Sequence, residues 1–225
     1  MNIRNCILSL ISCGAALTTA SAHEVWIEDT PEGRLVLRFA EYGGEYEKSP
    51  GALDSLSMPV VFTESEPGKG KFTDAARKAD HFLLGDIPAK VSTQAEVAFA
   101  VMGGSDKPAR KPVFYARWQQ ADWKAATPAL TFDIVPTATP GEVRIVFRGE
   151  PLADAKASAY VPGGAEIELT SDKNGVIRIP VEKPGFYLIV GKHQRESQKG
   201  FWSGKAYDTL SHNCSLAFRV APKKP

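Results

Sequence analysis

The sequence has few of the residues and none of the motifs that commonly identify an enzyme. Its 225 residues include three cysteines and four histidines. It contains no G-x-S-x-G elbow, no H-E-x-x-H helix, no C-x-x-C pair and no glycine-rich phosphate loop. Nothing in it supports hydrolytic or cofactor-based catalysis. We therefore predict a protein that is not an enzyme.

The chain also lacks an excess of charge of either sign. It has 27 lysines and arginines against 26 acidic residues, and removal of residues 1–22, which contain Arg4 and no acidic residue, leaves 26 of each. A balanced chain carries no basic footprint for nucleic acid or for an anionic membrane. No apolar run after residue 22 approaches the ~18 residues of a spanning helix. We expect no nucleic-acid partner and no membrane span in the mature chain.

The N-terminal residues have the pattern of a secretory signal peptide. Arg4 precedes an apolar run from Cys6 to Leu17, and Ala20-Ser21-Ala22 forms a small-x-small cleavage site. We predict a signal peptide over 1–22 and a periplasmic product. An alternative cut exists, because Leu10-Ile11-Ser12-Cys13 resembles a lipoprotein box, and its use would leave His23 inside the chain.

Cleavage after Ala22 would make His23 the first residue of the mature protein. An N-terminal histidine offers a metal its free α-amine and its imidazole together. The ordinary pKa of an α-amine is about 7.7–8.0, so a metal displaces its proton at little cost. The alternative is that His23 follows the cleavage site by chance, since residues after the cut are weakly restricted.

We expect no disulfide bond within the mature chain. Two of the three cysteines lie within residues 1–22, which leaves Cys214 without an intramolecular partner. A secreted chain of about two hundred residues without a disulfide relies on ordinary hydrophobic cores for stability.

Short alternating segments typical of β-strands fill most of the chain. They predict an all-β fold with two β-sandwich-like domains, an N-terminal β domain over 23–136 and a second over 137–225. The linker between them is Pro136 to Gly141, and the second domain has the strand spacing of a sandwich. Its expected core residues are Ile145, Phe147, Ile177, Ile179 and Leu188. The expected strands include 35–39, 95–102, 113–118, 142–148, 155–161, 165–170, 176–180, 186–192 and 214–220.

The remaining histidines are the other candidate metal ligands. His193 ends one expected strand and His212 precedes another, so a hairpin would place both imidazoles at the mouth of the loop 194–211. His81, at the start of a further expected strand, is a weaker candidate. Imidazole suits nickel, cobalt, copper and zinc. The alternative is that these histidines are solvated or structural.

Acidic residues near His23 are candidates for a supporting role. Glu24, Glu28, Glu41 and Glu45 lie next to His23 or in the first loop, 41–52. Their carboxylates can serve as oxygen ligands or hold an imidazole by a hydrogen bond. The alternative is that most of them form the solvated face of an edge strand.

Several segments resemble known families. Ala22–Glu28 resembles the A-H-E-F-W-I-E-P opening of a secreted bacterial domain family of unknown function that is described as a periplasmic component of cobalt and nickel transport systems. Leu130–Pro136 with Gly149–Ala155 resembles that family's L-E-I-V-P and G-K-P-L-A-G-A segments. Thr170–Gly175 resembles its T-D-x-N-G turn with one extra residue, and Lys183–Leu188 its K-P-G-x-Y-L ending. The C-terminal pattern is also that of transthyretin-like and carboxypeptidase-regulatory sandwiches.

The resemblance implies a non-enzymatic periplasmic protein linked to nickel or cobalt uptake, with a membrane permease as its partner. The ion would be captured by His23 and by side chains such as His81, His193 or His212. Two alternatives belong to other classes. One is a copper enzyme or chaperone that uses an N-terminal histidine brace, and the other is a structural sandwich that binds a protein or glycan partner.

Overall fold

The computed structural model describes residues 23–64, 69–105, 107–120, 123–164 and 166–222. The predicted signal peptide, its cleavage site and the lipoprotein-like box lie outside the described residues. The regular structure is almost entirely β, which confirms the predicted fold class. The strands are β1 (Glu24–Asp29), β2 (Arg34–Ala40), β3 (Val60–Glu64), β4 (Gly70–Thr73), β5 (Ala76–Arg77), β6 (Phe82–Pro88), β7 (Ser92–Ala98), β8 (Arg110–Gln119), β9 (Phe132–Pro136), β10 (Glu142–Phe147), β11 (Glu150–Pro151), β12 (Lys156–Tyr160), β13 (Glu166–Thr170), β14 (Val176–Arg178), β15 (Gly185–Trp202) and β16 (Lys205–Val220).

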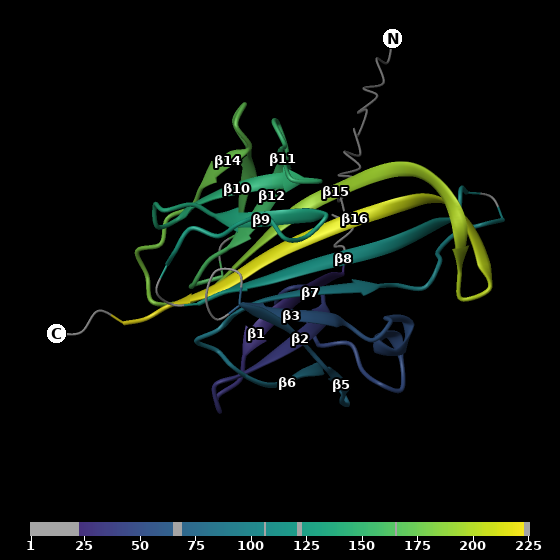
Figure 1. The fold of residues 1–225 in the computed structure, drawn as a ribbon, viewed down its shortest axis with the longest axis horizontal. Coiled ribbons are helices and arrows are strands. Elements are labelled where there is room, and N and C mark those ends of the chain that lie inside the picture. The colour runs from purple at the N-terminus through teal and green to yellow at the C-terminus, as the bar shows by residue number, and fades with distance from the viewer. Residues whose placement is uncertain (1–22, 65–68, 106, 121–122, 165, 223–225) are drawn as a thin grey trace, which may run out of the picture.

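Three sheets form three layers (Figure 1). The central sheet has eight strands in the order β13-β12-β15-β16-β8-β7-β3-β4. A four-stranded sheet, β1-β2-β6-β5, covers one of its faces. A second small sheet, in which β10 pairs with β9, β11 and β14, covers the other face. The short 3-10 helix Ala52–Ser55 lies in the connection that follows β2. No helix in the described part of the chain is long and apolar enough to cross a membrane.

Each face of the central sheet has its own hydrophobic core. Successive side chains of a strand point to opposite faces, so a strand covered on both sides is buried along its whole length. β8 shows this, because residues 112–119 are all buried while Phe114 and Trp118 enter one core and Val113 and Tyr115 enter the other. The first core, against β1, β2 and β6, includes Trp26, Ile27, Leu37, Phe82, Trp118 and Leu188. The second core, against β9, β10 and β14, includes Phe132, Ile134, Ile145, Tyr187, Ile189 and Phe218.

The expected core of the second sandwich is mostly found in this second core. Ile145, Ile177 and Ile179 are buried there, and Phe147 is half-buried at its edge. The prediction for Leu188 was wrong, because Leu188 is fully buried in the first core. Its neighbours Tyr187 and Ile189 face the second core. The error arose because β15 is covered on both faces, so its apolar run does not show which residues point to which side.

The two halves of the chain share the central sheet. β8 and β16 pair in parallel along ten residues, from Thr209 opposite Arg110 to Phe218 opposite Gln119. β9, which precedes the predicted boundary at 136/137, pairs with β10, which follows it. The predicted boundary therefore does not coincide with a boundary between sheets.

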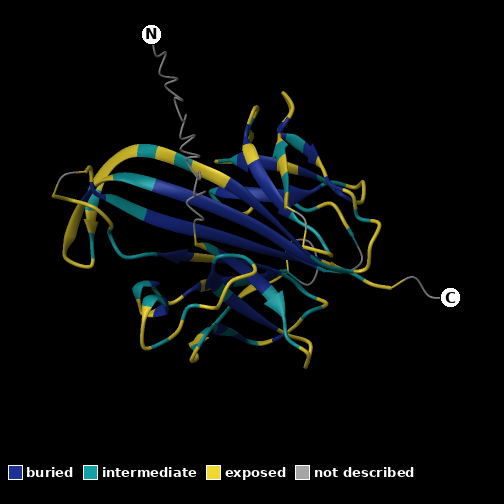
Figure 2. Ribbon diagram, turned by 180° about the vertical axis from the view of Figure 1, so that it is seen from behind, coloured by how far each residue is buried: buried dark blue, intermediate teal, exposed yellow. Residues whose placement is uncertain are grey.

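The segment 194–211 is not a loop, contrary to expectation. β15 continues through it to Trp202, and β16 begins at Lys205, so the two strands form a long β-ribbon closed by Ser203 and Gly204, both at positive φ. The ribbon extends beyond the layers, and much of its β15 side is exposed (Figure 2). Polar residues occupy both of its faces, so the alternation that marks a half-buried strand is missing from its sequence.

A buried ion pair links the central sheet to the second small sheet. The guanidinium of Arg117 in β8 donates to both carboxylate oxygens of Asp133 in β9, at 2.9 and 2.6 Å. The two side chains are only 1% and 0% exposed. Backbone N–H groups of Ala129 and Leu130 also donate to Asp133, at 3.0 and 3.2 Å. The pair fixes the position of β8, whose opposite end forms one wall of the candidate site.

Candidate functional site

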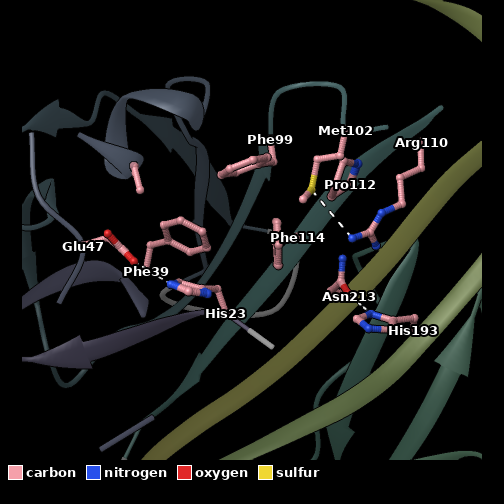
Figure 3. A pocket seen from close by; sticks show the side chains of 11 residues that line it. His23, Phe39, Glu47, Phe99, Met102, Arg110, Pro112, Phe114, His193 and Asn213 are labelled. Carbon is pink, nitrogen blue, oxygen red and sulfur yellow. Dashed lines mark hydrogen bonds and ion pairs between the residues drawn. The ribbon is translucent and has the colours of Figure 1, made fainter. Parts of the chain in front are cut away.

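A pocket of about 420 Å³ lies where the start of β1 meets the central sheet (Figure 3). This volume is within the range of small-ligand sites. Its walls come from segments distant in sequence: the beginning of β1, the loop after β2, β8 and the β15–β16 ribbon. The lining residues are His23, Phe39, Glu47, Ala52, Phe99, Met102, Arg110, Pro112, Phe114, His193 and Asn213.

His23 is held at the pocket by a carboxylate and an aromatic ring. Its Nε2 lies 2.5 Å from Oε1 of Glu47, and its ring centroid is 5.2 Å from that of Phe39. The Glu47 backbone N–H donates to the Phe39 carbonyl, which ties the loop to β2. An ionised carboxylate accepts hydrogen bonds only, so the proton of a neutral His23 ring is on Nε2. The Nδ1 atom, on the backbone side of the ring, then keeps its lone pair.

His193 is oriented by Asn213 on the neighbouring strand. The Asn213 amide nitrogen donates to the carbonyls of Val113 and Ser211, at 3.2 and 3.1 Å. This places the Asn213 Oδ1 atom toward His193 Nδ1, with which it makes a short hydrogen bond. Since an amide oxygen only accepts, Nδ1 carries a proton, and in a neutral ring Nε2 then keeps its lone pair. A ring N–H fixed by an oxygen acceptor is the usual support of a metal-binding histidine.

The two histidines occupy opposite sides of the pocket. Figure 3 shows His23 with Glu47 and Phe39 on one side, and His193 with Asn213 and Arg110 on the other. Within the part of the chain that the structure describes, no three His, Cys, Asp or Glu side chains are grouped closely enough to hold a metal ion by themselves. Side chains alone therefore supply fewer than three such donors at this pocket.

His212 lies on the opposite face of the central sheet from His193. It is 2% exposed, and its ring packs between Tyr115 and Phe147, with ring centroids 5.9 and 5.3 Å away. Its Nδ1 is 3.0 Å from the Tyr115 hydroxyl and its Nε2 is 3.1 Å from Glu196. Burial lowers the pKa of His212, and the hydrogen bond and negative charge of Glu196 partly offset this lowering of the pKa. Both ring nitrogens have partners, so the geometry is that of a structural histidine. The expectation that His193 and His212 lie together is wrong, because the face alternates along each strand.

His81 lies apart from the pocket. Its Nδ1 is 2.6 Å from Asp80, whose carboxylate also pairs with Arg38 at 3.0 Å. The hydrogen bond from His81 is the main reason that the pKa of Asp80 is lowered. His81 does not line the pocket with His23 and His193.

The carboxylate that contacts His23 is not one of the four expected from the sequence. It is Glu47, from the loop 41–52. Glu28 pairs with Arg38 at 2.8 Å and accepts from the Trp26 indole at 2.9 Å. Glu24, next to His23, is different, because burial raises its pKa to about 8.

Arg110 and Asn213 are further site residues that sequence reasoning missed. Arg110 begins β8 and lines the pocket, and the contact found for its guanidinium is with the Met102 sulfur, at 3.7 Å. Asn213 follows the buried His212 by one residue, so it points to the pocket face. Asn213 lies between His212 and the expected strand 214–220, and no local pattern marks its contact with His193 of β15.

Comparison with known proteins gives no family. No protein-family model and no curated protein matches the chain. The resemblance of Ala22–Glu28 to the cobalt and nickel transport family therefore stays a prediction.

Proposed function

We propose that the protein is a periplasmic, non-enzymatic metal-binding protein that captures nickel or cobalt at His23. The observation that supports this is the pairing of His23 with His193 at one pocket, each with one ring nitrogen hydrogen-bonded to a side-chain oxygen and the other nitrogen left with its lone pair. Such nitrogens suit late divalent ions of the first transition row.

The proposed chelate depends on cleavage after residue 22. The α-amine of His23 and its Nδ1 would then bind the ion together, while Glu47 keeps the Nε2 proton in place. His193 Nε2, on the opposite side of the pocket, is the next donor. Binding would release the amine proton and would weaken as the pH falls through the range in which amine and imidazole take up protons.

Calorimetry with nickel and cobalt tests this proposal. We compare the processed protein with a form carrying one extra residue before His23 and with His23→Ala. The extra residue turns the His23 nitrogen into an amide, a far poorer ligand, so both changes should weaken binding to a similar extent. His81→Ala is the matched control, because His81 is outside the pocket, and it should bind as the unmodified protein does. Equal affinity in all four proteins would place the ion elsewhere and refute the proposal.

A copper histidine brace is a second candidate, favoured by one specific observation. That arrangement needs a second histidine and an aromatic residue around the N-terminal histidine. His193 lines the same pocket as His23, and Phe39 packs against the His23 ring. Oxygen consumption by the copper-loaded protein with ascorbate separates the two candidates. Sustained consumption that is lost in His193→Ala would support a copper redox role, and its absence would leave ion capture as the function.

A further inference from the structure

A second pocket lies next to the first, at Met102 and Arg110. It has a volume of about 540 Å³ and shares Met102 and Arg110 with the His23 pocket. Its other lining residues are Gly103, Lys107, Pro108, Arg195 and Thr209. Three of the described lining residues are basic and none is acidic. Of the two adjoining pockets, one therefore holds the histidine nitrogens and the other is lined by cationic side chains.

The cationic end has the chemistry of an anion site. Lys107 precedes β8, Arg110 begins it, and Arg195 comes from the adjoining ribbon, so three elements bring positive charge to one pocket. Neither Arg110 nor Arg195 forms an ion pair with a carboxylate among the described residues. A guanidinium presents a planar fork of N–H donors that matches a carboxylate in two parallel hydrogen bonds.

The donors proposed for the ion leave room for such a ligand. The α-amine, His23 Nδ1 and His193 Nε2 make three, one fewer than the four of a square-planar nickel site. A cation alone gains nothing from three basic residues beside its pocket. A cation that arrives with a carboxylate chelator would bring its own oxygen donors, and Arg110 would stabilise the negative charge of a chelator carboxylate that does not bind the ion.

We propose that the two adjoining pockets bind the metal ion as a complex with a small polycarboxylate chelator, the ion at His23 and His193 and a free carboxylate at Arg110, with Lys107 and Arg195 beside it. This inference rests on the proposed metal-binding function and names its substrate class.

Equilibrium dialysis of the processed protein with nickel and labelled citrate tests the inference. Three mixtures are compared: nickel alone, citrate alone, and nickel with citrate. We expect citrate to be retained with nickel in equal amounts, and citrate alone to be retained at least about tenfold more weakly, because the ion then no longer bridges it to the histidines.

Arg110→Gln separates recognition of the complex from binding of the ion. It should lower retention of citrate with nickel at least about tenfold, the effect of losing a charge-assisted pair of hydrogen bonds. Nickel alone is titrated into the same variant, and the loss of affinity for nickel with citrate should exceed any change in the affinity for nickel alone by at least about tenfold. Arg144→Gln is the matched control, since Arg144 is exposed on β10 and does not line either pocket. Thermal melting of both variants checks that they fold.

Two failures can be told apart. If citrate strips nickel from the protein, or if Arg110→Gln retains citrate as well as Arg144→Gln does, the chelator inference is wrong and ion capture stands. If nickel is not bound with or without citrate, the proposed function and the inference are both wrong.

Discussion

Replacing Arg117 with methionine should destabilise the protein strongly. The change removes the ion-pair partner of Asp133 inside a site that is essentially closed to water. Among the described residues, the donors left to the Asp133 carboxylate would be the backbone N–H groups of Ala129 and Leu130. Breaking a buried ion pair by removal of one partner costs about 3–5 kcal/mol, because the remaining charge is uncompensated.

Urea denaturation measures this effect. With an m value of about 2 kcal/mol/M, a loss of about 4 kcal/mol lowers the midpoint by about 2 M. The double variant Arg117→Met/Asp133→Leu should recover most of the loss, since no unpaired charge remains. The control is Arg219→Met, which breaks the more exposed pair with Asp29 and should cost less than about 1 kcal/mol. A loss below about 1 kcal/mol for Arg117→Met would show that Asp133 does not depend on Arg117 for its compensation.

Two further predictions concern stability. Between pH 4.5 and about 8 the folded protein keeps a proton on Glu24 that the unfolded chain has released, so Glu24 makes the free energy of unfolding fall as the pH rises through that window. In urea denaturation at pH 5 and pH 8, Glu24→Gln should remove this contribution to the fall. The same difference in unfolding free energy between the two pH values in variant and unmodified protein would contradict the prediction. Ile145→Ala, at a fully buried position, should lower the free energy of unfolding by about 2–5 kcal/mol, and Phe147→Ala, at a half-buried position, by about 2 kcal/mol. Urea denaturation measures both losses. A loss for Phe147→Ala well above that for Ile145→Ala would show that Phe147 contributes more to the second core than its exposure indicates.

The all-β fold could be predicted from sequence because it depends on local patterns. Alternation over 142–148 and 176–180 marked strands that bury one face, and Asn174-Gly175 marked the turn before β14. The parallel pairing of β8 with β16 could not be predicted in this way, since it joins residues about a hundred positions apart and has no local signal. Strands buried on both faces also hide their orientation, which is why Leu188 was assigned to the wrong core.

The candidate site was predictable only in part, because it too depends on contacts between segments that lie far apart in the sequence. His23 and His193 were identified by residue type, and the loop 41–52 was recognised as irregular. Glu47 and Arg110 have no motif around them, and they become site residues only where that loop and β8 meet the start of β1. His212 was grouped with His193 by proximity along the expected hairpin, and the alternation of faces separates them.

The most direct test of the central claim is a crystal structure of the processed protein soaked with nickel, with anomalous data collected at the nickel edge. We expect a mature chain that begins at His23 and one strong anomalous peak in the pocket, within bonding distance of the His23 amine and Nδ1. A peak beside His81 or His212, or a pocket without a peak while nickel binds elsewhere, would contradict it.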